Sequence, residues 1–414
     1  MRTYLIVVLM SAMTLVCLEA ADYPQWRGPA RDGISSETGL LKEWPKDGPK
    51  LKWKIDKIGG GWSTPSVAGD KIFLIVDKDK KEFAVALNEK DGSTIWSTEL
   101  GSVGINTGPQ YPGSRSTPTV DGSLVYCLGS NGDLACLDVE KGGVKWKKNF
   151  KTDFGGKLGL WAFAESPLID GDVLICTPGG EKATMAALDK MTGATRWESV
   201  VPGGDTASYA SAIVAQGAGI KQYIQFVQNG VIGVDAATGK FLWRDDRTKD
   251  KAANIATPLF YNDMVFTSSG RAVGGAVKLT AVDGGIQATP LYKDPALATG
   301  IGGAIRIGDH IFLNNRQLVC CEFATGKVLW EDKSIGAASI SVADGHLYLH
   351  GHENGTVALV EVSTAGYKEK SRFTPTHEIK AKQAWCHPVV ANGCLYIRDL
   401  EVLCSYDVKD AAGK

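Results

Sequence analysis

The chain has 414 residues, of which 49 are glycine, 16 are proline and 9 are cysteine. It carries 45 basic and 46 acidic residues, and its formal net charge of −1 gives no overall field that would attract nucleic acid or an anionic membrane. We therefore expect no nucleic-acid partner. The high glycine content is typical of a fold with many tight turns.

The N-terminal residues predict an exported protein. An arginine precedes an apolar run at residues 4–16, and small residues follow at Ala20 and Ala21. This is the pattern of a secretory signal peptide rather than of a membrane span. We expect residues 1–20 to be removed, the mature chain to have no transmembrane segment, and the protein to be periplasmic or secreted. The residues before Cys17 are not the small ones of a lipid-anchor site, so we expect no anchor there.

After an N-terminal extension at residues 21–48, the chain repeats two phrases. The first is an apolar run, split by a Gly or Asp turn, that follows a small residue and often a proline, as in WSTPSVAGDKIFLIV and RSTPTVDGSLVYCLG. The second reaches a tryptophan through a glycine turn, as in ALDKMTGATRW, VDAATGKFLW and EFATGKVLW. Short runs of β-branched and apolar residues bounded by turn residues predict strands joined by hairpins.

The repeat predicts an all-β fold, an eight-bladed β-propeller of four-stranded antiparallel blades, at residues 49–410. The first strands are expected to begin near Ser63, Ser116, Ser166, Ser211, Thr257, Gly303, Ala338 and His387. The last blade has only three strands before the chain ends, whereas GPKLKWKID near the N-terminus supplies a lone strand that carries Trp53. Because an open sheet edge leaves backbone groups unpaired, we expect this outer strand to close the ring in the last blade. We expect a monomer.

The repeated tryptophan is expected to pack against the neighbouring blade, with the glycine of the turn at positive φ. The tryptophans are Trp96, Trp146, Trp197, Trp243 and Trp330, and Tyr292 takes the corresponding place in a sixth copy.

The cysteines form three suggestive pairs. An Asn-Gly turn would place Cys127 opposite Cys136, and a turn at Asp399 would place Cys394 opposite Cys404. Each of these two pairs is either a disulfide or two buried thiols. The third pair, Cys320 and Cys321, is adjacent within a predicted strand, so the two side chains are expected to point to opposite faces.

Candidate binding residues lie just before the first strands, where side chains and blade-connecting loops face one end of the central channel. These residues are Trp62, Arg115, Trp161, Glu165, Tyr209, Asn254, Trp385 and His387. We expect Arg115, Trp161 and Glu165 to meet on one rim of the channel. The two longest connecting loops, at residues 97–115 and 147–166, carry aromatic side chains that we expect to be exposed, namely Tyr111, Phe150, Phe154, Trp161 and Phe163.

Histidines cluster in HLYLHGHENG, where His346, His350 and His352 follow the two-residue period of a strand. The pair His350 and His352, next to Glu353, has donors suited to zinc or copper. The same residues next to a turn are also consistent with a solvated cluster. Since no fourth ligand stands at a defined spacing, we expect no metal site.

The repeat phrases resemble the pyrroloquinoline-quinone-type β-propeller repeat over nearly the whole mature chain. This superfamily includes quinoprotein alcohol and sugar dehydrogenases and a non-enzymatic lipoprotein that helps to assemble outer-membrane β-barrels. In many of the enzymes a disulfide between adjacent cysteines covers the quinone (PQQ) beside a calcium ion, whereas Cys320 and Cys321 lie in a regular strand here. We therefore expect no catalytic residue and no cofactor, but a binding or scaffolding module for an envelope protein or a small-molecule ligand. The alternative is a PQQ-dependent alcohol or sugar oxidoreductase that binds PQQ with calcium.

Overall fold

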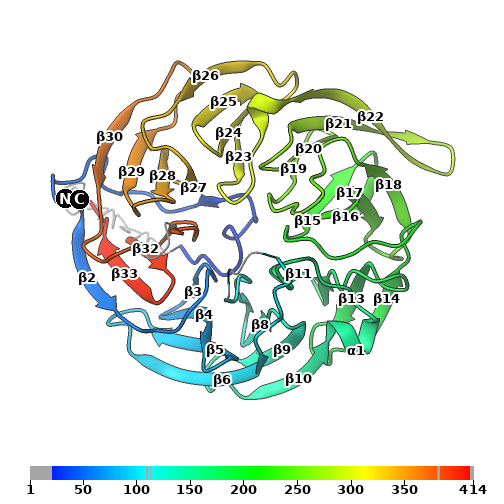
Figure 1. The fold of residues 1–414 in the computed structure, drawn as a ribbon, viewed down its shortest axis with the longest axis horizontal. Coiled ribbons are helices and arrows are strands. Elements are labelled where there is room, and N and C mark those ends of the chain that lie inside the picture. Colours follow the sequence, from blue (N-terminus) through cyan, green and yellow to red (C-terminus); the bar gives the residue numbers. More distant parts are fainter. Residues whose placement is uncertain (1–20, 109–110, 112, 380–382, 411–414) are drawn as a thin grey trace, which may run out of the picture.

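The computed structural model describes residues 21–108, 111, 113–379 and 383–410, so the predicted signal peptide and Cys17 lie outside the described residues. Eight antiparallel sheets stand around a central channel (Figure 1). In each sheet the first strand lies innermost and the fourth lies at the outer rim. The predicted eight-bladed, all-β propeller is therefore confirmed.

The blades follow one another in chain order. The strands of the first four blades are β3 (Ser66–Ala68), β4 (Lys71–Lys78), β5 (Lys81–Asn88), β6 (Thr94–Ser102); β7 (Thr119–Asp121), β8 (Leu124–Leu128), β9 (Asp133–Asp138), β10 (Val144–Asn149); β11 (Leu168–Asp170), β12 (Val173–Cys176), β13 (Met185–Asp189), β14 (Thr195–Ser199); β15 (Ile213–Gly217), β16 (Ile220–Val227), β17 (Gly230–Asp235) and β18 (Phe241–Asp245).

The next three blades and the incomplete eighth complete the ring. Their strands are β19 (Leu259–Tyr261), β20 (Met264–Ser268), β21 (Gly274–Val282), β22 (Gly285–Asp294); β23 (Ala304–Ile307), β24 (His310–Asn314), β25 (Leu318–Glu322), β26 (Val328–Asp332); β27 (Ala338–Ala343), β28 (His346–Gly351), β29 (Val357–Glu361), β30 (Glu369–Phe373); β31 (Val389–Ala391), β32 (Cys394–Asp399) and β33 (Val402–Asp407). The first strands begin at the predicted positions or up to three residues later.

The ring is closed by a strand from the other end of the chain, as the sequence predicts. Strand β2 (Lys50–Ile55) pairs antiparallel with β33, and Trp53 lies opposite Ser405. The two strands lie side by side in Figure 1, although β2 is blue and β33 is red. A further short strand, β1 (Ile34–Ser35), pairs in parallel with the innermost strand β27. The N-terminal part of the chain is thus attached to two neighbouring blades.

Aromatic side chains join each blade to the next. The indole Nε1 of Trp96 donates a hydrogen bond to the carbonyl of Val139 in the following blade, at 2.8 Å. Trp53, Trp146, Trp197 and Trp330 make the same kind of bond, and the hydroxyl of Tyr292 takes their place in the fifth blade. Trp243 is the exception, because its Nε1 bonds Gln222 of its own blade.

The turn glycines have two roles in these joints. Gly142 and Gly239 have φ values of 65° and 74°, in the left-handed region that glycine adopts without strain. A Cβ added at Gly142 would lie 2.6 Å from the Trp96 ring, and one at Gly239 would lie 2.6 Å from the Trp197 ring. The glycine therefore permits both the turn and the close approach of the ring from the preceding blade.

The strand registers correct the cysteine predictions. Cys127 lies opposite Ala135, and Cys136 lies opposite Tyr126, because the hairpin turn extends over residues 129–132 rather than two residues. Cys394 lies opposite Asp407, because the last hairpin turns after Asp399 rather than at it. All eight cysteines of the described residues are buried free thiols. Cys320 and Cys321 pack into two different core clusters, so their predicted opposite orientation is confirmed.

The long loop after β10 is more ordered than the sequence predicts. It begins with a short helix, α1 (Phe150–Phe154), capped by the side chain of Asn149 and ended by Gly155 at φ 63°. Phe150, Phe154 and Phe163 are buried with the second and third blades, which contradicts the expected exposure. A single 3₁₀ turn, η1 (Pro295–Leu297), follows β22. Within the described part of the chain, no helix has the length and apolar character needed to cross a bilayer.

Candidate functional site

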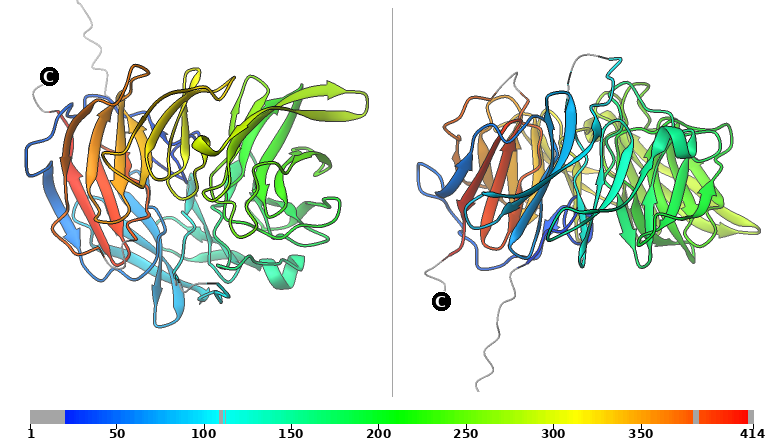
Figure 2. Two further views of the ribbon diagram at one scale, coloured as in Figure 1. Left: turned by 45° about the horizontal axis from the view of Figure 1, so that its top comes forward. Right: turned by 90° about the horizontal axis from the view of Figure 1, so that it is seen from below.

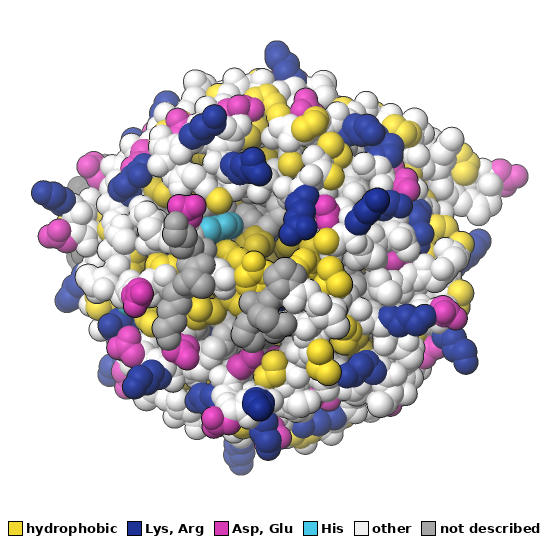
Figure 3. All heavy atoms as spheres, viewed as in Figure 1, with side chains coloured by type: hydrophobic (Ala, Val, Ile, Leu, Met, Phe, Trp, Pro, Cys, Tyr) yellow, Lys and Arg dark blue, Asp and Glu magenta, His cyan; other side chains and the backbone are white. Residues whose placement is uncertain are grey.

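A pocket of about 400 Å³ opens at one end of the central channel. Its walls come from the segments that precede the first strands and from the hairpins between second and third strands. Seen from this end, the pocket is a hollow lined by apolar side chains at the centre of the ring (Figure 3). Six aromatic residues line it, namely Trp26, Trp62, Tyr111, Trp161, Tyr209 and Trp385.

The N-terminal segment forms the floor of the pocket. In the side views of Figure 2 this blue segment lies at one end of the ring, and the cyan loop after β6 rises at the other. Tyr23 forms a β-bridge with Val67 near the inner edge of the first blade. The indole Nε1 of Trp26 donates to Thr257 Oγ1 across the channel at 3.0 Å. The segment therefore closes the channel and leaves a pocket with one open end.

Two buried arginines attach this segment to the inner strands. Arg27 donates to the carbonyls of Asp32 and Ala304. Arg31 donates to the carbonyls of Ser166, Pro167 and Ala212, which belong to the third and fourth blades. Burial lowers the pKa of Arg31 to about 9, so desolvation of its guanidinium is only partly offset by the nearby Glu165.

The aromatic residues form two groups around the wall. Trp62 and Trp385 are stacked, with centroids 5.0 Å apart and an interplanar angle of 28°, and Tyr111 meets the Trp385 ring edge-on. On the other side, the Trp161 and Tyr209 rings are 5.7 Å apart. These rings come from the first, second, third and eighth blades and their connections, so the apolar wall is built by residues far apart in the sequence.

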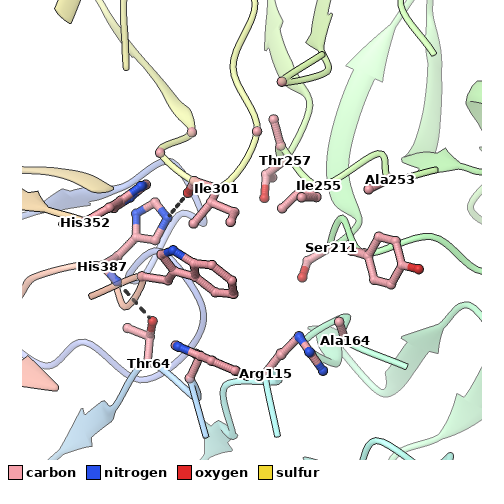
Figure 4. A pocket seen from close by; sticks show the side chains of 18 of the residues that line it. Thr64, Arg115, Ala164, Ser211, Ala253, Ile255, Thr257, Ile301, His352 and His387 are labelled. Atoms are coloured by element: carbon pink, nitrogen blue, oxygen red, sulfur yellow. Dashed lines mark hydrogen bonds between the residues drawn. The ribbon is translucent and has the colours of Figure 1, made fainter. Parts of the chain in front are cut away.

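Arg115 lies between the two aromatic groups. Its guanidinium carbon is 5.2 Å from the centroid of the Trp62 ring, within the range of a cation–π contact. The side chain donates to the carbonyls of Tyr111, Gly113 and Trp161. In Figure 4, Arg115 and His387 face the same space from different blades. Burial lowers the pKa of Arg115 to about 10.

Two histidines also line the pocket. The His387 ring contacts the carbonyls of Ile340 and Ile301, each at 2.9 Å, and packs edge-on against Trp26. Burial, with a smaller contribution from Arg27, lowers the pKa of His387 to about 4. Burial also lowers the pKa of His352 to about 3. The imidazole of His352 is therefore neutral at pH 7.

The structure brings six of the eight candidate binding residues into the pocket wall, namely Trp62, Arg115, Trp161, Tyr209, Trp385 and His387. Glu165 and Asn254 do not line it. Glu165 accepts hydrogen bonds from Thr177 N and Gln225 Nε2, and burial raises its pKa to about 7. The Asn254 amide donates to two carbonyls at the end of β16. Arg115 and Trp161 thus meet at the rim, whereas the Glu165 carboxyl lies behind the wall.

The two candidate metal-binding histidines lie in different surroundings. His350 is fully buried in β28, which contradicts a solvated cluster, and its Nε2 lies 3.4 Å from Asp399 Oδ1. His352 follows the end of β28 and contacts Ser339. Asp399 has a second partner, since its Oδ2 lies 2.7 Å from Nε2 of His377. His377 was not among the candidate residues predicted from the sequence. Among the described residues, no group of three or more His, Cys, Asp or Glu side chains is arranged to hold a metal ion.

Sequence reasoning missed the contribution of the N-terminal extension to the pocket. Trp26 and Arg27 line its floor, although they precede the first blade by some forty residues of chain. The sequence did contain a signal, because the segment YPQWRGPARDG holds two aromatic and two basic residues within eleven positions. Such residues are suited to packing and hydrogen bonding. Arg271 in the hairpin of the fifth blade was also missed, because a single exposed arginine beside glycine is indistinguishable from an ordinary turn residue.

The fold and the site together define a closed eight-bladed propeller with an aromatic pocket at one end of its channel. Comparison with known proteins identifies the family. The family model described as "Outer membrane protein assembly factor BamB" matches residues 34–156 and 80–332, so the chain belongs to this family of PQQ-like propellers.

Individual relatives are distant. The outer membrane protein assembly factor BamB of Yersinia pestis is 22% identical over 339 residues, covering 76% of this chain and 78% of the relative. The BamB of Salmonella typhimurium is 30% identical over 120 residues, covering 28% of each chain.

Solved structures share the fold. BamB from Moraxella catarrhalis has a TM-score of 0.54 and 16% identity, covering 81% of this chain and 96% of that one. The quinohemoprotein alcohol dehydrogenase of Comamonas testosteroni has a TM-score of 0.52 and 13% identity, covering 94% of this chain and 81% of that one. At such identities the likeness extends to the fold alone.

Proposed function

We propose that this protein is a non-catalytic binding module of the cell envelope that takes part in outer-membrane protein assembly. The observation that carries the proposal is the aromatic pocket, which the N-terminal segment closes at one end and which opens on the other end of the ring. Concave, mostly apolar sites with a few polar groups are the usual places for ligand recognition. Membership of the BamB family supports the assembly role.

The rim of the pocket supports contact with a protein partner. The loop after β6 is joined to the loop after β10, since the Thr107 amide donates to the Leu160 carbonyl. Beside this joint, the side chains of Ile105 and Leu160 are 74% and 41% exposed. Exposed apolar side chains next to a pocket favour protein contact, because their burial in an interface is stabilising.

We place a PQQ-dependent oxidoreductase second. Among the described residues that line the pocket there is no Asp or Glu, so the wall offers no carboxylate to hold calcium beside a quinone. The adjacent cysteines Cys320 and Cys321 are buried on opposite faces of β25, away from the pocket wall. These residues do not fit the calcium–quinone site.

A photo-crosslinking experiment tests the proposal. Leu160, at the rim, and Met191, which is 59% exposed in the turn between β13 and β14 at the opposite end of the ring, are each replaced by a benzophenone amino acid in cells. We expect the Leu160 position to crosslink to an outer-membrane assembly protein and the Met191 position not to. Equal crosslinking at both positions, or crosslinking at Met191 alone, would contradict binding at the pocket end. Dye reduction by purified protein with alcohol, PQQ and calcium would instead favour the enzyme.

A further inference from the structure

The charged side chains that line the pocket are all basic. Arg27, Arg115 and Arg271 contribute guanidinium groups, whereas the described lining residues include no Asp or Glu. The two lining histidines, His352 and His387, add no negative charge to the wall. The net charge of the pocket wall is therefore positive, although the charge of the whole chain is close to zero.

The buried arginines of the wall are held by carbonyl groups and not by carboxylates. Arg27 and Arg115 donate to backbone oxygens at every hydrogen bond the structure gives them, and Arg27 Nε has no partner among the described residues. Carbonyl dipoles orient a guanidinium but carry no net charge to balance it. A buried cation that makes no hydrogen bond to an anion is costly, and an incoming anion relieves part of that cost.

The neighbouring acidic groups compensate this charge only in part. Asp32 lies near Arg27, and Asp77 and Glu82 lie near Arg115. Burial raises the pKa of Asp77, and it raises that of Glu82 to about 8, which disfavours the ionised forms that would balance Arg115. Arg271 is exposed at the mouth and makes no hydrogen bond or ion pair within the described part of the chain. One guanidinium group at the mouth is thus available to a ligand without breaking an existing contact.

The rest of the wall is suited to an apolar ring. Indole and phenol rings line two sides, and Ile255 and Ile301 add aliphatic surface between them (Figure 4). A pocket of about 400 Å³ has room for an aromatic group with a short polar tail and not for a folded domain.

Building on the proposed binding function, we propose that the pocket recognises a carboxylate carried on an aromatic or other apolar ring. The guanidinium groups would attract the carboxylate, and the aromatic wall would cover the ring. Two sources have this chemistry: a free aromatic acid, and the C-terminus of a chain whose last residue is aromatic.

Calorimetry with four probes tests the ligand chemistry. The probes are N-acetylphenylalanine, its amide, a hexapeptide Gly-Ser-Gly-Ser-Gly-Phe with a free carboxylate, and the same peptide amidated. We expect each carboxylate to bind about tenfold tighter than its amide, a difference of about 1.4 kcal/mol. A peptide acid that binds much tighter than the small acid would identify a chain terminus as the source, and equal affinities would identify a free acid. Equal affinity of acid and amide, or no binding by either acid, would overturn the proposal.

A pair of variants locates the charge. Arg271→Gln is expected to weaken binding of the carboxylate probes by roughly fivefold and to leave the amides unchanged. The matched control is Arg316→Gln, which removes an exposed arginine next to the lining residue Asn315 but outside the pocket wall. Equal losses in the two variants would overturn a role for the pocket charge. If the probes fail while Leu160 still crosslinks to a partner, the ligand chemistry is wrong and the binding function stands.

Discussion

At the residue scale, substitution of the turn glycines can distinguish backbone strain at positive φ from steric overlap with a neighbouring tryptophan ring. Gly239 and Gly122 both have positive φ, 74° and 58°, but an added Cβ would meet the Trp197 ring only at Gly239, and nothing within 4 Å at Gly122. We expect Gly239→Ala to lower the free energy of unfolding by about 1–3 kcal/mol more than Gly122→Ala, because overpacking adds to the backbone cost. Urea denaturation measures both. Equal losses would show that the ring contact contributes nothing.

Trp243 tests the contribution of a joint residue to stability. Its side chain is 3% exposed, packs between the fourth and fifth blades, and bonds Gln222 Oε1 at 2.6 Å. We expect Trp243→Ala to lower the free energy of unfolding by about 3–5 kcal/mol, the range for a buried aromatic residue. Met191→Ala, at an exposed position, serves as the control. A loss below about 1 kcal/mol for the tryptophan variant would mean that the site repacks without it.

At the element scale, a histidine–aspartate pair connects His377, which follows β30, to Asp399 at the end of β32. Burial lowers the pKa of His377, but its hydrogen bonds to Asp399 and to Cys404 Sγ outweigh this effect and raise the pKa from 6.5 to about 9. Burial also opposes ionisation of Asp399, but His350 and His377 together hold its pKa well below the usual range. The pair therefore attaches the chain that follows β30 to the eighth blade at His377.

The sign of the pH dependence follows from these directions. The stabilising contribution of His377 is complete below pH 6.5 and is lost as the pH rises through about 9, whereas that of Asp399 is lost as the pH falls below 3.8. We expect His377→Gln to lower the free energy of unfolding at pH 6 and to have a smaller effect at pH 9.5. The control variant is His310→Gln, in β24. A loss that does not change between the two pH values would show that the charged pair is not the cause.

A structural feature of this fold could be predicted from the sequence when the contact that forms it recurs in each blade. The glycine turn and its tryptophan recur with the blade period, so their position in the fold could be predicted, and so could the incomplete last blade that needs Trp53. Hairpin length does not recur, and a turn of four residues instead of two moved Cys127 out of register with Cys136. Phe150 and Phe163 looked exposed because the cap at Asn149 and the α1 turn belong to one loop only.

The candidate site was predictable in the same uneven way. Residues before the first strands face the channel in every blade, so Arg115, Trp161 and His387 could be placed near its mouth from the repeat alone. Whether a side chain turns inward or back into the wall depends on single hydrogen bonds, which turned Glu165 toward Thr177. The N-terminal segment has no repeat to predict its path, and its role in the floor became visible only in three dimensions.

At the scale of the whole molecule, three variants that begin at different residues can distinguish the effect of ring closure from the effect of pocket formation. Starting at residue 56 removes β2 and leaves the outer edge of β33 unpaired, so we expect the largest drop in melting temperature. Starting at residue 36 keeps β2 but removes Trp26, Arg27 and Arg31, so we expect a smaller drop and an open channel that no longer binds the carboxylate probes. Starting at residue 21 provides the reference. If the chain that starts at residue 56 has the same melting temperature as the reference, closure by β2 does not stabilise the ring.

The pairing of β2 with β33 also imposes an order on folding. The strand that leaves the ribosome among the first must wait for a partner that is made among the last, since Trp53 and Ser405 lie near opposite ends of the sequence. Contacts of such high sequence separation slow folding, and an unpaired strand is open to wrong pairing in the meantime. Moving β2 to the C-terminus by circular permutation would make the same contact local. We expect the permuted chain to refold faster and to aggregate less, because β2 and β33 would then be close in sequence. The folded structure would be unchanged, since the same strands would pair.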